Sequence, residues 1–178
     1  LHSTNQAFLD SMTTFARRLS LLGALNSLSQ ITLKATMPGV PDFYQGAEFW
    51  DLSLVDPDNR RPVDFVIRDA ILDAAAPQDW PRLIESWTSG HLKLAWTKML
   101  LDMRGRFPDV FGKGAYRPLA VDGPDRDHVV AYAREHENNA VIVAVGRHFA
   151  GLTGQGRHWP RGAFDATLDT SAYAVNTA

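Results

Sequence analysis

The segment from Met37 to Phe65, MPGVPDFYQGAEFWDLSLVDPDNRRPVDF, constrains the fold more than any other part of the chain. It contains four prolines and two glycines, and a helical pattern of apolar residues stops where it begins. Because a residue that precedes proline is disfavoured in the α region, Pro38 predicts the end of that helix. We therefore expect a long irregular connection between one helix before this segment and further helices after it.

Before Pro38 the sequence has the periodicity of a helix from about Asn5 to Lys34. Apolar residues recur at intervals of three and four in its first half and predict an apolar stripe; they are Phe8, Met12, Phe15, Leu19 and Leu22. In the second half apolar residues spread round more of the circumference, and we expect burial on several sides. Gly23 lies between the two halves and predicts a kink or short break.

After Pro38 the pattern predicts a short strand from Val40 to Tyr44, opening into a loop from Gln45 to Asp64. Pro41 cannot donate to a ladder, so this strand cannot be a long central one. A loop of this length in a compact domain usually has a function. The helix and the short strand together predict an αβ unit.

Two further helices are expected after the loop, over Val66–Ala76 and over His91–Arg104, with a proline-bounded turn at Pro77–Pro81. The second helix has a clear apolar stripe, and Lys93 and Lys98 lie outside it.

The composition changes near residue 113, and four β-rich runs follow: Tyr116–Val121, His128–Glu135, Ala140–His148 and Ala163–Leu168. Glu137-Asn138-Asn139 joins the second run to the third, which is a strong hairpin signal. We therefore predict an α/β part over residues 1–113 and an antiparallel β part over residues 114–178.

Composition excludes several classes of function. Net charge is −2, from 18 basic and 20 acidic residues that are intermixed, which argues against nucleic acid or an anionic membrane as the partner. The chain has no cysteine, so disulfides and thiolate metal sites are excluded, and a cytoplasmic location is expected. The histidines lack metal-ligand spacing and no nucleotide-binding glycine motif occurs, so we expect no metal and no cofactor. The chain starts without Met and enters a helical pattern at once, which predicts a piece of a longer protein.

The loop concentrates charge, with carboxylates and arginines close to aromatic residues: Asp42, Glu48, Asp51, Asp56, Asp58, Arg60, Arg61 and Asp64. Glycoside chemistry uses paired carboxylates, and Asp–Arg clusters beside aromatic rings suit ligands rich in hydroxyl groups. Trp50 in the same loop is a candidate for stacking on a sugar ring. The alternative is a loop held together by Asp–Arg pairs and proline turns, with no role in chemistry.

Three blocks of sequence carry a resemblance. PGVPDFYQGAE (Pro38–Glu48) resembles the G-[IV]-P-x-x-Y-x-G-x-E signature at the eighth barrel strand of the α-amylase superfamily of glycoside hydrolases. NSLSQITLKATMPGVPDFYQG (Asn26–Gly46) and WDLSLVDPDNRRPVDF (Trp50–Phe65) resemble, more particularly, the maltooligosyl trehalose synthase family. WTSGHLKLAWTKMLLDMRGRFPDVFGKGAYRPL (Trp87–Leu119) is similar to that family's last barrel helices and the entry to its β-domain.

The resemblance implies the end of a TIM-type (β/α)8 barrel, mostly helical in this segment, followed by part of an antiparallel β-sandwich. It implies an isomerase of trehalose biosynthesis that turns the reducing-end α-1,4 linkage of a maltodextrin into an α,α-1,1 linkage by intramolecular transglycosylation. The family's Asp nucleophile, Glu acid/base and second Asp come from barrel strands four, five and seven. We expect these upstream of Leu1, so we assign no catalytic residue to this chain and expect it to be inactive alone.

Loops that follow barrel strands face the substrate, so the resemblance implies that this loop holds the terminal glucose. The candidate binding residues are Tyr44, Gln45, Glu48, Asp56, Asp58, Asn59, Arg60 and Arg61. The expected partners are a maltooligosaccharide and the rest of the parent barrel, and an isolated chain is expected to self-associate through an exposed apolar face.

Three alternatives stay open. An α-amylase or 4-α-glucanotransferase would have the same barrel end, although the DPDNRRPVDF run (Asp56–Phe65) disfavours it. A non-catalytic carbohydrate-binding module would need exposed aromatic residues in the β part, where the candidates are few. A stand-alone interaction domain is the third.

Overall fold

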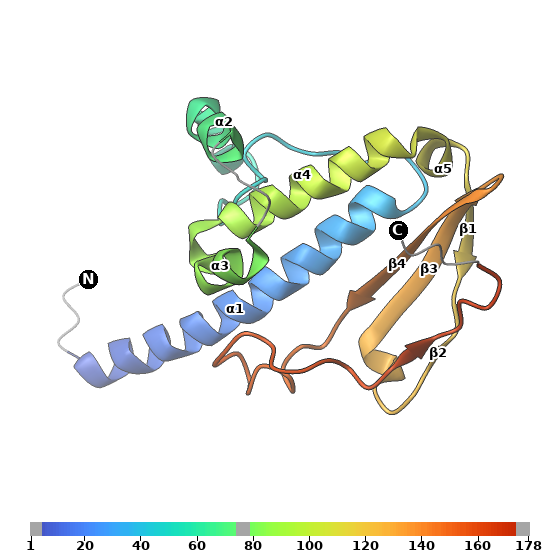
Figure 1. Ribbon diagram of the computed structural model, residues 1–178. Coiled ribbons are helices and arrows are strands. Elements are labelled where there is room, and N and C mark those ends of the chain that lie inside the picture. Colours follow the sequence, from blue (N-terminus) through green and yellow to red (C-terminus); the bar gives the residue numbers. More distant parts are fainter. Residues whose placement is uncertain (1–4, 74–78, 174–178) are drawn as a thin grey trace. The chain divides into compact units, whose positions relative to one another are not determined.

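The computed structural model describes residues 5–73 and 79–173. It divides into two compact units, Leu1–Pro38 with Asp109–Ala178, and Gly39–Pro108. The first unit combines a long helix with antiparallel strands, and the second is a loop followed by helices (Figure 1). The division predicted at residue 113 stays a prediction, but the first helix groups here with the strands and not with the segment that follows it.

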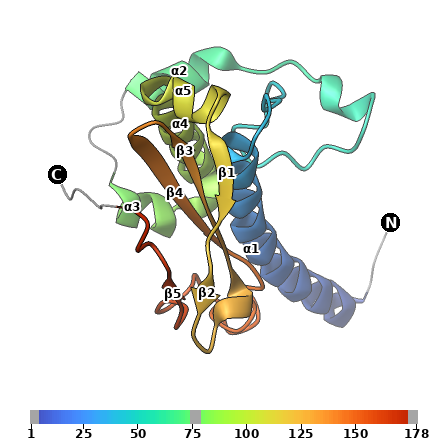
Figure 2. The ribbon, with the colours of Figure 1, turned by 90° about the vertical axis from the view of Figure 1, so that its right-hand side faces the viewer.

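The first unit is built on a three-stranded antiparallel sheet with strand order β1-β3-β4, and β2 and β5 form a separate two-stranded ribbon (Figure 2). Its elements are α1 (Gln6–Thr36), α5 (Pro108–Gly112), β1 (Ala115–Pro118), β2 (Val121–Asp122), η3 (Arg126–His128), β3 (Val129–His136), β4 (Asn139–Gly146) and β5 (Thr167–Leu168). The expected strand 116–121 is thus divided into β1 and β2, and the expected strand 163–168 is reduced to its last two residues.

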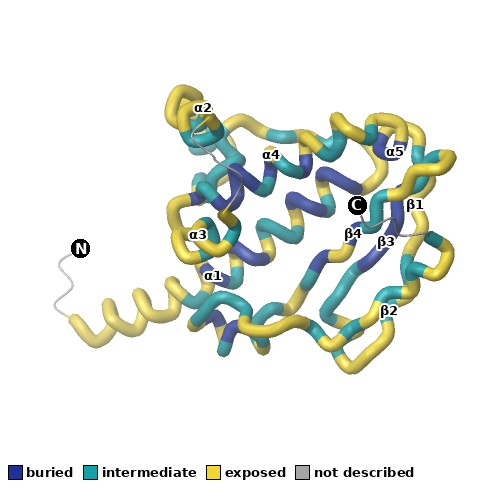
Figure 3. Tube along the Cα trace, viewed as in Figure 1, coloured by how far each residue is buried: buried dark blue, intermediate teal, exposed yellow. Residues whose placement is uncertain are grey.

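Helix α1 begins after Asn5, whose side chain accepts a hydrogen bond from the backbone N–H of Phe8 at 3.1 Å. It runs through Gly23 without interruption, so the expected break there is wrong. A single glycine costs a helix only about 1 kcal/mol, which the flanking turns offset. The apolar stripe of the first half is exposed within the described part of the chain, from Phe8 at 56% to Leu19 at 51% (Figure 3).

The second half of α1 packs on the sheet. Leu33 contacts a core cluster made of Tyr132 on β3 with Val143 and Val145 on β4. The Ser29 hydroxyl donates to the carbonyl oxygen of Gly146 at 2.8 Å. These contacts confirm the expected burial of this half and explain why α1 belongs to the same unit as the strands.

Strands β3 and β4 form the predicted hairpin. His136 pairs with Asn139, so the connection consists of Glu137 and Asn138. Glu137 has a φ of 52°, in the left-handed region that tight hairpin turns require. Local sequence signals were sufficient to locate this turn.

The second unit contains η1 (Asp58–Arg60), α2 (Phe65–Asp73), α3 (Trp80–Glu85), η2 (Trp87–Ser89) and α4 (His91–Arg106). The predicted helices over 66–76 and 91–104 are confirmed as α2 and α4, and residues 74–76 lie outside the described part. Helix α3 was not expected; Asp79 caps it by accepting from the N–H of Arg82 at 3.2 Å. Trp80 packs edge-on against Trp96 of α4, with ring centroids 5.7 Å apart.

Residues 40–44 form no strand in the described structure, so the expected strand there is wrong. A strand exists only where its N–H and C=O groups find partners on neighbouring strands. The strands of the first unit pair with one another and none of them pairs with this segment. A local sequence pattern does not show whether a partner strand is present.

Candidate functional site

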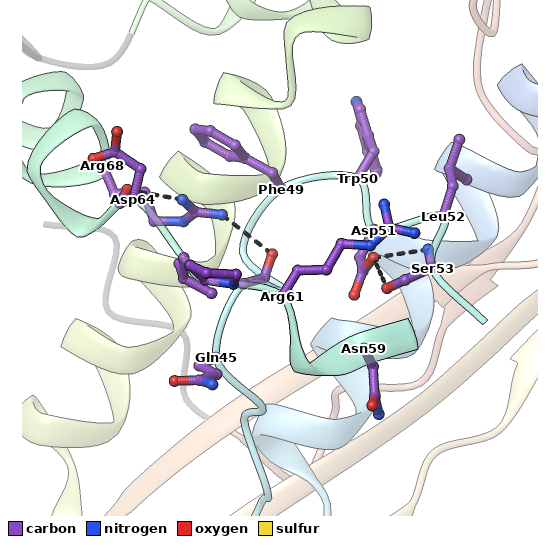
Figure 4. Close-up of a pocket in the computed structure, with 13 residues that line it drawn as sticks. Gln45, Phe49, Trp50, Asp51, Leu52, Ser53, Asn59, Arg61, Asp64 and Arg68 are labelled. Carbon is purple, nitrogen blue, oxygen red and sulfur yellow. Dashed lines mark hydrogen bonds between the residues drawn. The ribbon is translucent and has the colours of Figure 1, made fainter. Parts of the chain in front are cut away.

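A cavity of about 530 Å³ lies in the loop that precedes α2. Small-molecule sites usually have volumes of about 300–1,000 Å³. The lining residues all come from the loop and the first turn of α2 (Figure 4); they are Gln45, Gly46, Phe49, Trp50, Asp51, Leu52, Ser53, Asn59, Arg61, Pro62, Val63, Asp64 and Arg68. The pocket therefore belongs to one compact unit.

Arg68 joins the two ends of the loop. Its Nε lies 3.3 Å from Oε2 of Glu48, and another guanidinium nitrogen donates to the backbone carbonyl of Asp64 at 2.9 Å. Its guanidinium carbon is 4.6 Å from the ring centroid of Phe49, a cation–π distance. The planar fork of an arginine can make all these contacts at once, so Arg68 fixes the outer wall of the pocket.

On the other side of the pocket, Trp50 attaches the loop to the residues that precede α4. Its indole Nε1–H donates to the carbonyl oxygen of Trp87 at 2.6 Å, and the two rings meet nearly perpendicular with centroids 6.1 Å apart. The Lys93 ammonium donates to the carbonyl oxygen of Phe49 at 3.1 Å. The loop is thus attached both to itself and to the start of α4, whose N-cap is Gly90.

Two carboxylates of the loop have lowered pKa values. The pKa of Asp51 falls mainly because the hydroxyl and backbone N–H of Ser53 donate to it, with a smaller effect from the charge of Lys93. The pKa of Asp58 falls mainly because the backbone N–H of Leu54 donates to it at 2.7 Å, and then because of Arg61. Both groups are ionised at neutral pH, so they suit accepting hydrogen bonds and not general-acid chemistry.

The structure places three of the predicted binding residues in the pocket lining: Gln45, Asn59 and Arg61. Arg61 extends across the pocket toward Asp51 (Figure 4). The side-chain oxygen of Asn59 is buried and has no hydrogen-bond partner among the residues that the structure describes. A buried acceptor of this kind is costly unless a ligand or water supplies a donor.

The other predicted residues lie outside the lining. Glu48 acts as the ion-pair partner of Arg68, and Tyr44 is 43% exposed. The remaining ones form exposed ion pairs within the loop, Asp56 with Arg60 and Asp58 with Arg61. For these the alternative interpretation, a loop held by Asp–Arg pairs, describes the contacts that are seen. A direct role in binding stays a prediction for all eight.

Arg68, Phe49, Asp64 and Lys93 were missed as site residues. A signal existed for Arg68, because it lies in the first turn of the helix expected over 66–76, directly after the charged loop. Lys93 was placed outside the apolar stripe of its helix, and in the structure it is only 8% exposed. Its ammonium group reaches the carbonyl oxygen of Phe49 in the loop, a contact that a helical pattern alone does not reveal.

Within the described ranges, no group of three or more His, Asp or Glu side chains is arranged to hold a metal ion. The same residues include no helix that is both long and apolar enough to cross a membrane.

Comparison with known proteins identifies close relatives. No family model matches the chain. A protein of Mycobacterium tuberculosis strain H37Rv named putative maltooligosyl trehalose synthase is 36% identical over 162 residues, covering 82% of this chain and 19% of the relative. A crystal structure of a maltooligosyl trehalose synthase superposes with a TM-score of 0.71 at 33% identity, covering 80% of this chain and 19% of that one.

A second solved structure, the maltooligosyltrehalose synthase of Arthrobacter ramosus, gives a TM-score of 0.68 at 31% identity. It covers 96% of this chain and 20% of that protein. The chain therefore spans about a fifth of the length of the relatives that it matches.

Proposed function

We propose, on the premise that this chain is homologous to one segment of the maltooligosyl trehalose synthases, that it is part of an enzyme that forms maltooligosyl trehalose. The reaction moves the reducing-end glucose of a maltodextrin from an α-1,4 to an α,α-1,1 linkage by intramolecular transglycosylation. The observation that carries the proposal is 36% identity over 82% of the chain, together with a matching fold. The substrate is a maltooligosaccharide.

In this proposal the chain contributes the end of the catalytic barrel and part of a C-terminal β-sandwich. The nucleophile, the acid/base and the stabilising carboxylate lie in the rest of the enzyme, so the chain alone is inactive. A cytoplasmic location, consistent with the lack of cysteine, remains part of the proposal.

The pocket in the loop is proposed to hold one glucosyl residue. A pyranose ring has apolar faces and a rim of hydroxyl groups that both donate and accept hydrogen bonds. The lining matches both features, because Phe49 and Trp50 supply rings while Arg61 and Asp51 supply a donor and an acceptor.

A chimera tests the proposed activity. The 178 residues would replace the matching segment of the Mycobacterium tuberculosis relative, and the product would be incubated with maltopentaose. We expect reducing ends to disappear without release of glucose, because an α,α-1,1 linkage has no reducing end. The isolated chain at the same concentration should leave the substrate unchanged.

Matched variants locate the sugar pocket within that chimera. Arg61→Ala should raise KM, since the sugar loses a hydrogen-bond donor of the lining, whereas Asp102→Ala on the exposed face of α4 should not. A folded chimera that only releases glucose and short maltodextrins would favour an amylase instead. Tight binding of maltotriose by the isolated chain would favour a carbohydrate-binding module.

A further inference from the structure

Lys93 is a buried lysine in the middle of the attachment between the loop and α4. It is 8% exposed, and lysine is rarely buried to this extent unless its ammonium group has defined partners. One of its partners is the carbonyl oxygen of Phe49, at 3.1 Å and 44 residues away in the sequence. A charged donor makes a stronger and more directional hydrogen bond than a neutral one.

The same ammonium group lies beside Trp50. Its Nζ is 5.6 Å from the ring centroid, within the range of a cation–π contact. The indole N–H is held at the same time by the carbonyl oxygen of Trp87, at 2.6 Å. Trp50 is therefore held both at its ring face and at its only hydrogen-bond donor, so its orientation in the pocket wall is defined.

The residue before Trp50 also lies close to the start of α4. Gly90 has a φ of +83°, and a Cβ placed on it would lie 3.2 Å from Cβ of Phe49, so the loop approaches the start of α4 closely. The charge of Lys93 also contributes to the lowered pKa of Asp51, which follows Trp50 in the lining. Lys93 thus contacts the carbonyl of Phe49 and the ring of Trp50, and its charge lowers the pKa of Asp51.

We infer that Lys93 is a positioning residue that fixes Trp50 as the aromatic wall of the pocket. The consequence for sugar binding rests on the proposed function, but the positioning of Trp50 does not. Lys93 itself is absent from the pocket lining, so it acts through Trp50 and the Phe49 carbonyl and not by touching a ligand.

Hydrogen exchange of the tryptophan indole groups in the 15N-labelled 178-residue chain tests the inference. Trp50→Phe assigns the signal. Lys93→Met keeps the length and apolar stem but removes the ammonium, and the Trp50 indole N–H should then exchange about tenfold faster, the factor that one charge-assisted hydrogen bond supplies. Lys93→Arg keeps a cationic donor and should restore most of the protection.

The controls separate local positioning from general stability. Trp96 lies in the same unit and packs on Trp80, so its indole exchange should not change in Lys93→Met. Lys98→Met makes the same substitution on the same helix at an exposed position paired with Asp102, and it should leave Trp50 unchanged. If Lys93→Met does not fold, Lys93→Gln keeps a neutral donor and should give an intermediate rate.

Unchanged exchange of Trp50 in Lys93→Met, or in Lys93→Gln where the first variant is insoluble, overturns the inference. Equal acceleration of Trp50 and Trp96 also overturns it, since the lysine would then serve only global stability. In the active chimera, Lys93→Met should raise KM about tenfold with little change in kcat. Faster exchange without a change in KM would leave the positioning role intact and overturn the sugar role of the pocket.

Discussion

Thr36 and Tyr132 share a buried hydrogen bond of 2.5 Å between their side-chain oxygens, although 96 residues separate them in the sequence. The Thr36 hydroxyl also donates to the carbonyl oxygen of Thr32 at 2.6 Å, so the Tyr132 hydroxyl is the donor to Thr36. The bond joins the last turn of α1 to the middle of β3. Burial raises the pKa of Tyr132, which keeps the phenol protonated as this arrangement requires.

Removal of the Thr36 hydroxyl and removal of the Tyr132 hydroxyl should therefore lower the free energy of unfolding by different amounts. Thr36→Val leaves the Tyr132 hydroxyl buried without an acceptor and should lower the free energy of unfolding by about 1–3 kcal/mol. Tyr132→Phe removes the polar group itself and should cost about 1 kcal/mol. Urea unfolding measures both, with Tyr116→Phe as the control because Tyr116 is 39% exposed. A Thr36→Val variant no less stable than the control would contradict the role of this bond.

Arg134 organises the same region through the backbone. It is 2% exposed and donates to the carbonyl oxygens of Thr36 at 3.0 Å, Phe111 at 3.2 Å and Gly114 at 2.9 Å. The first two lie near the C-terminal ends of helices, where a positive charge is favourable. The guanidinium therefore connects α1, α5 and the start of β1.

We expect Arg134→Met to reduce the free energy of unfolding by about 3 kcal/mol or more, because three charge-assisted hydrogen bonds are lost at once. Arg134→Lys should keep only part of the free energy of unfolding that Arg134→Met loses, since one ammonium group cannot reach all three carbonyls. Arg117→Met, at an exposed ion pair with Glu135, should reduce the free energy of unfolding much less, because water and salt screen an exposed pair. Thermal and urea unfolding compare the three; equal losses for Arg134→Met and Arg117→Met would exclude the proposed role.

What the sequence could predict depended on how far apart the interacting residues are. The β3–β4 hairpin was located because its signal, Glu137 to Asn139, is contained within the turn. The expected strand over 40–44 was wrong because strand formation needs partners that no local pattern specifies. The partner of Lys93 is the carbonyl oxygen of Phe49, 44 residues earlier, so the helical period alone could not reveal this contact. A cavity lies in the loop that was singled out, and Arg68 was missed as a lining residue because it belongs to the helix that follows.

The Asp51 carboxylate should titrate below its usual value of 3.8 in the folded chain. A folded pKa below the unfolded one means that the carboxylate stabilises the fold above the unfolded pKa. That contribution is lost as the pH falls through the folded pKa, so it disappears in the acid range below about pH 4. Carboxyl 13C NMR against pH measures the midpoint directly.

Ser53→Ala should move the Asp51 midpoint upward toward 3.8, since the Ser53 hydroxyl is the largest cause of the lowered pKa. The backbone N–H of Ser53 still donates at 2.9 Å, so the return should be incomplete. Lys93→Met should move the Asp51 midpoint upward by less than Ser53→Ala does. A larger effect from Lys93→Met than from Ser53→Ala would show that charge, and not hydrogen bonding, sets this pKa.

Substitution by alanine should change the free energy of unfolding in opposite directions at the two ends of α4, at Gly90 and at Gly105. Gly90 caps α4 with a φ of +83°, and an added Cβ would meet Phe49 at 3.2 Å. Gly105 lies in the last turn of α4, and no atom of the described residues lies within 4 Å of an added Cβ there. Gly90→Ala should lower the free energy of unfolding by about 1–2 kcal/mol, because alanine is strained in the left-handed region and displaces the loop. Gly105→Ala should raise it by about 0.5–1 kcal/mol, since alanine is the better helix former. Urea unfolding gives both signs, and the Trp50 indole signal should shift only in Gly90→Ala. Stabilisation by both substitutions would mean that the loop does not approach the start of α4 closely in solution.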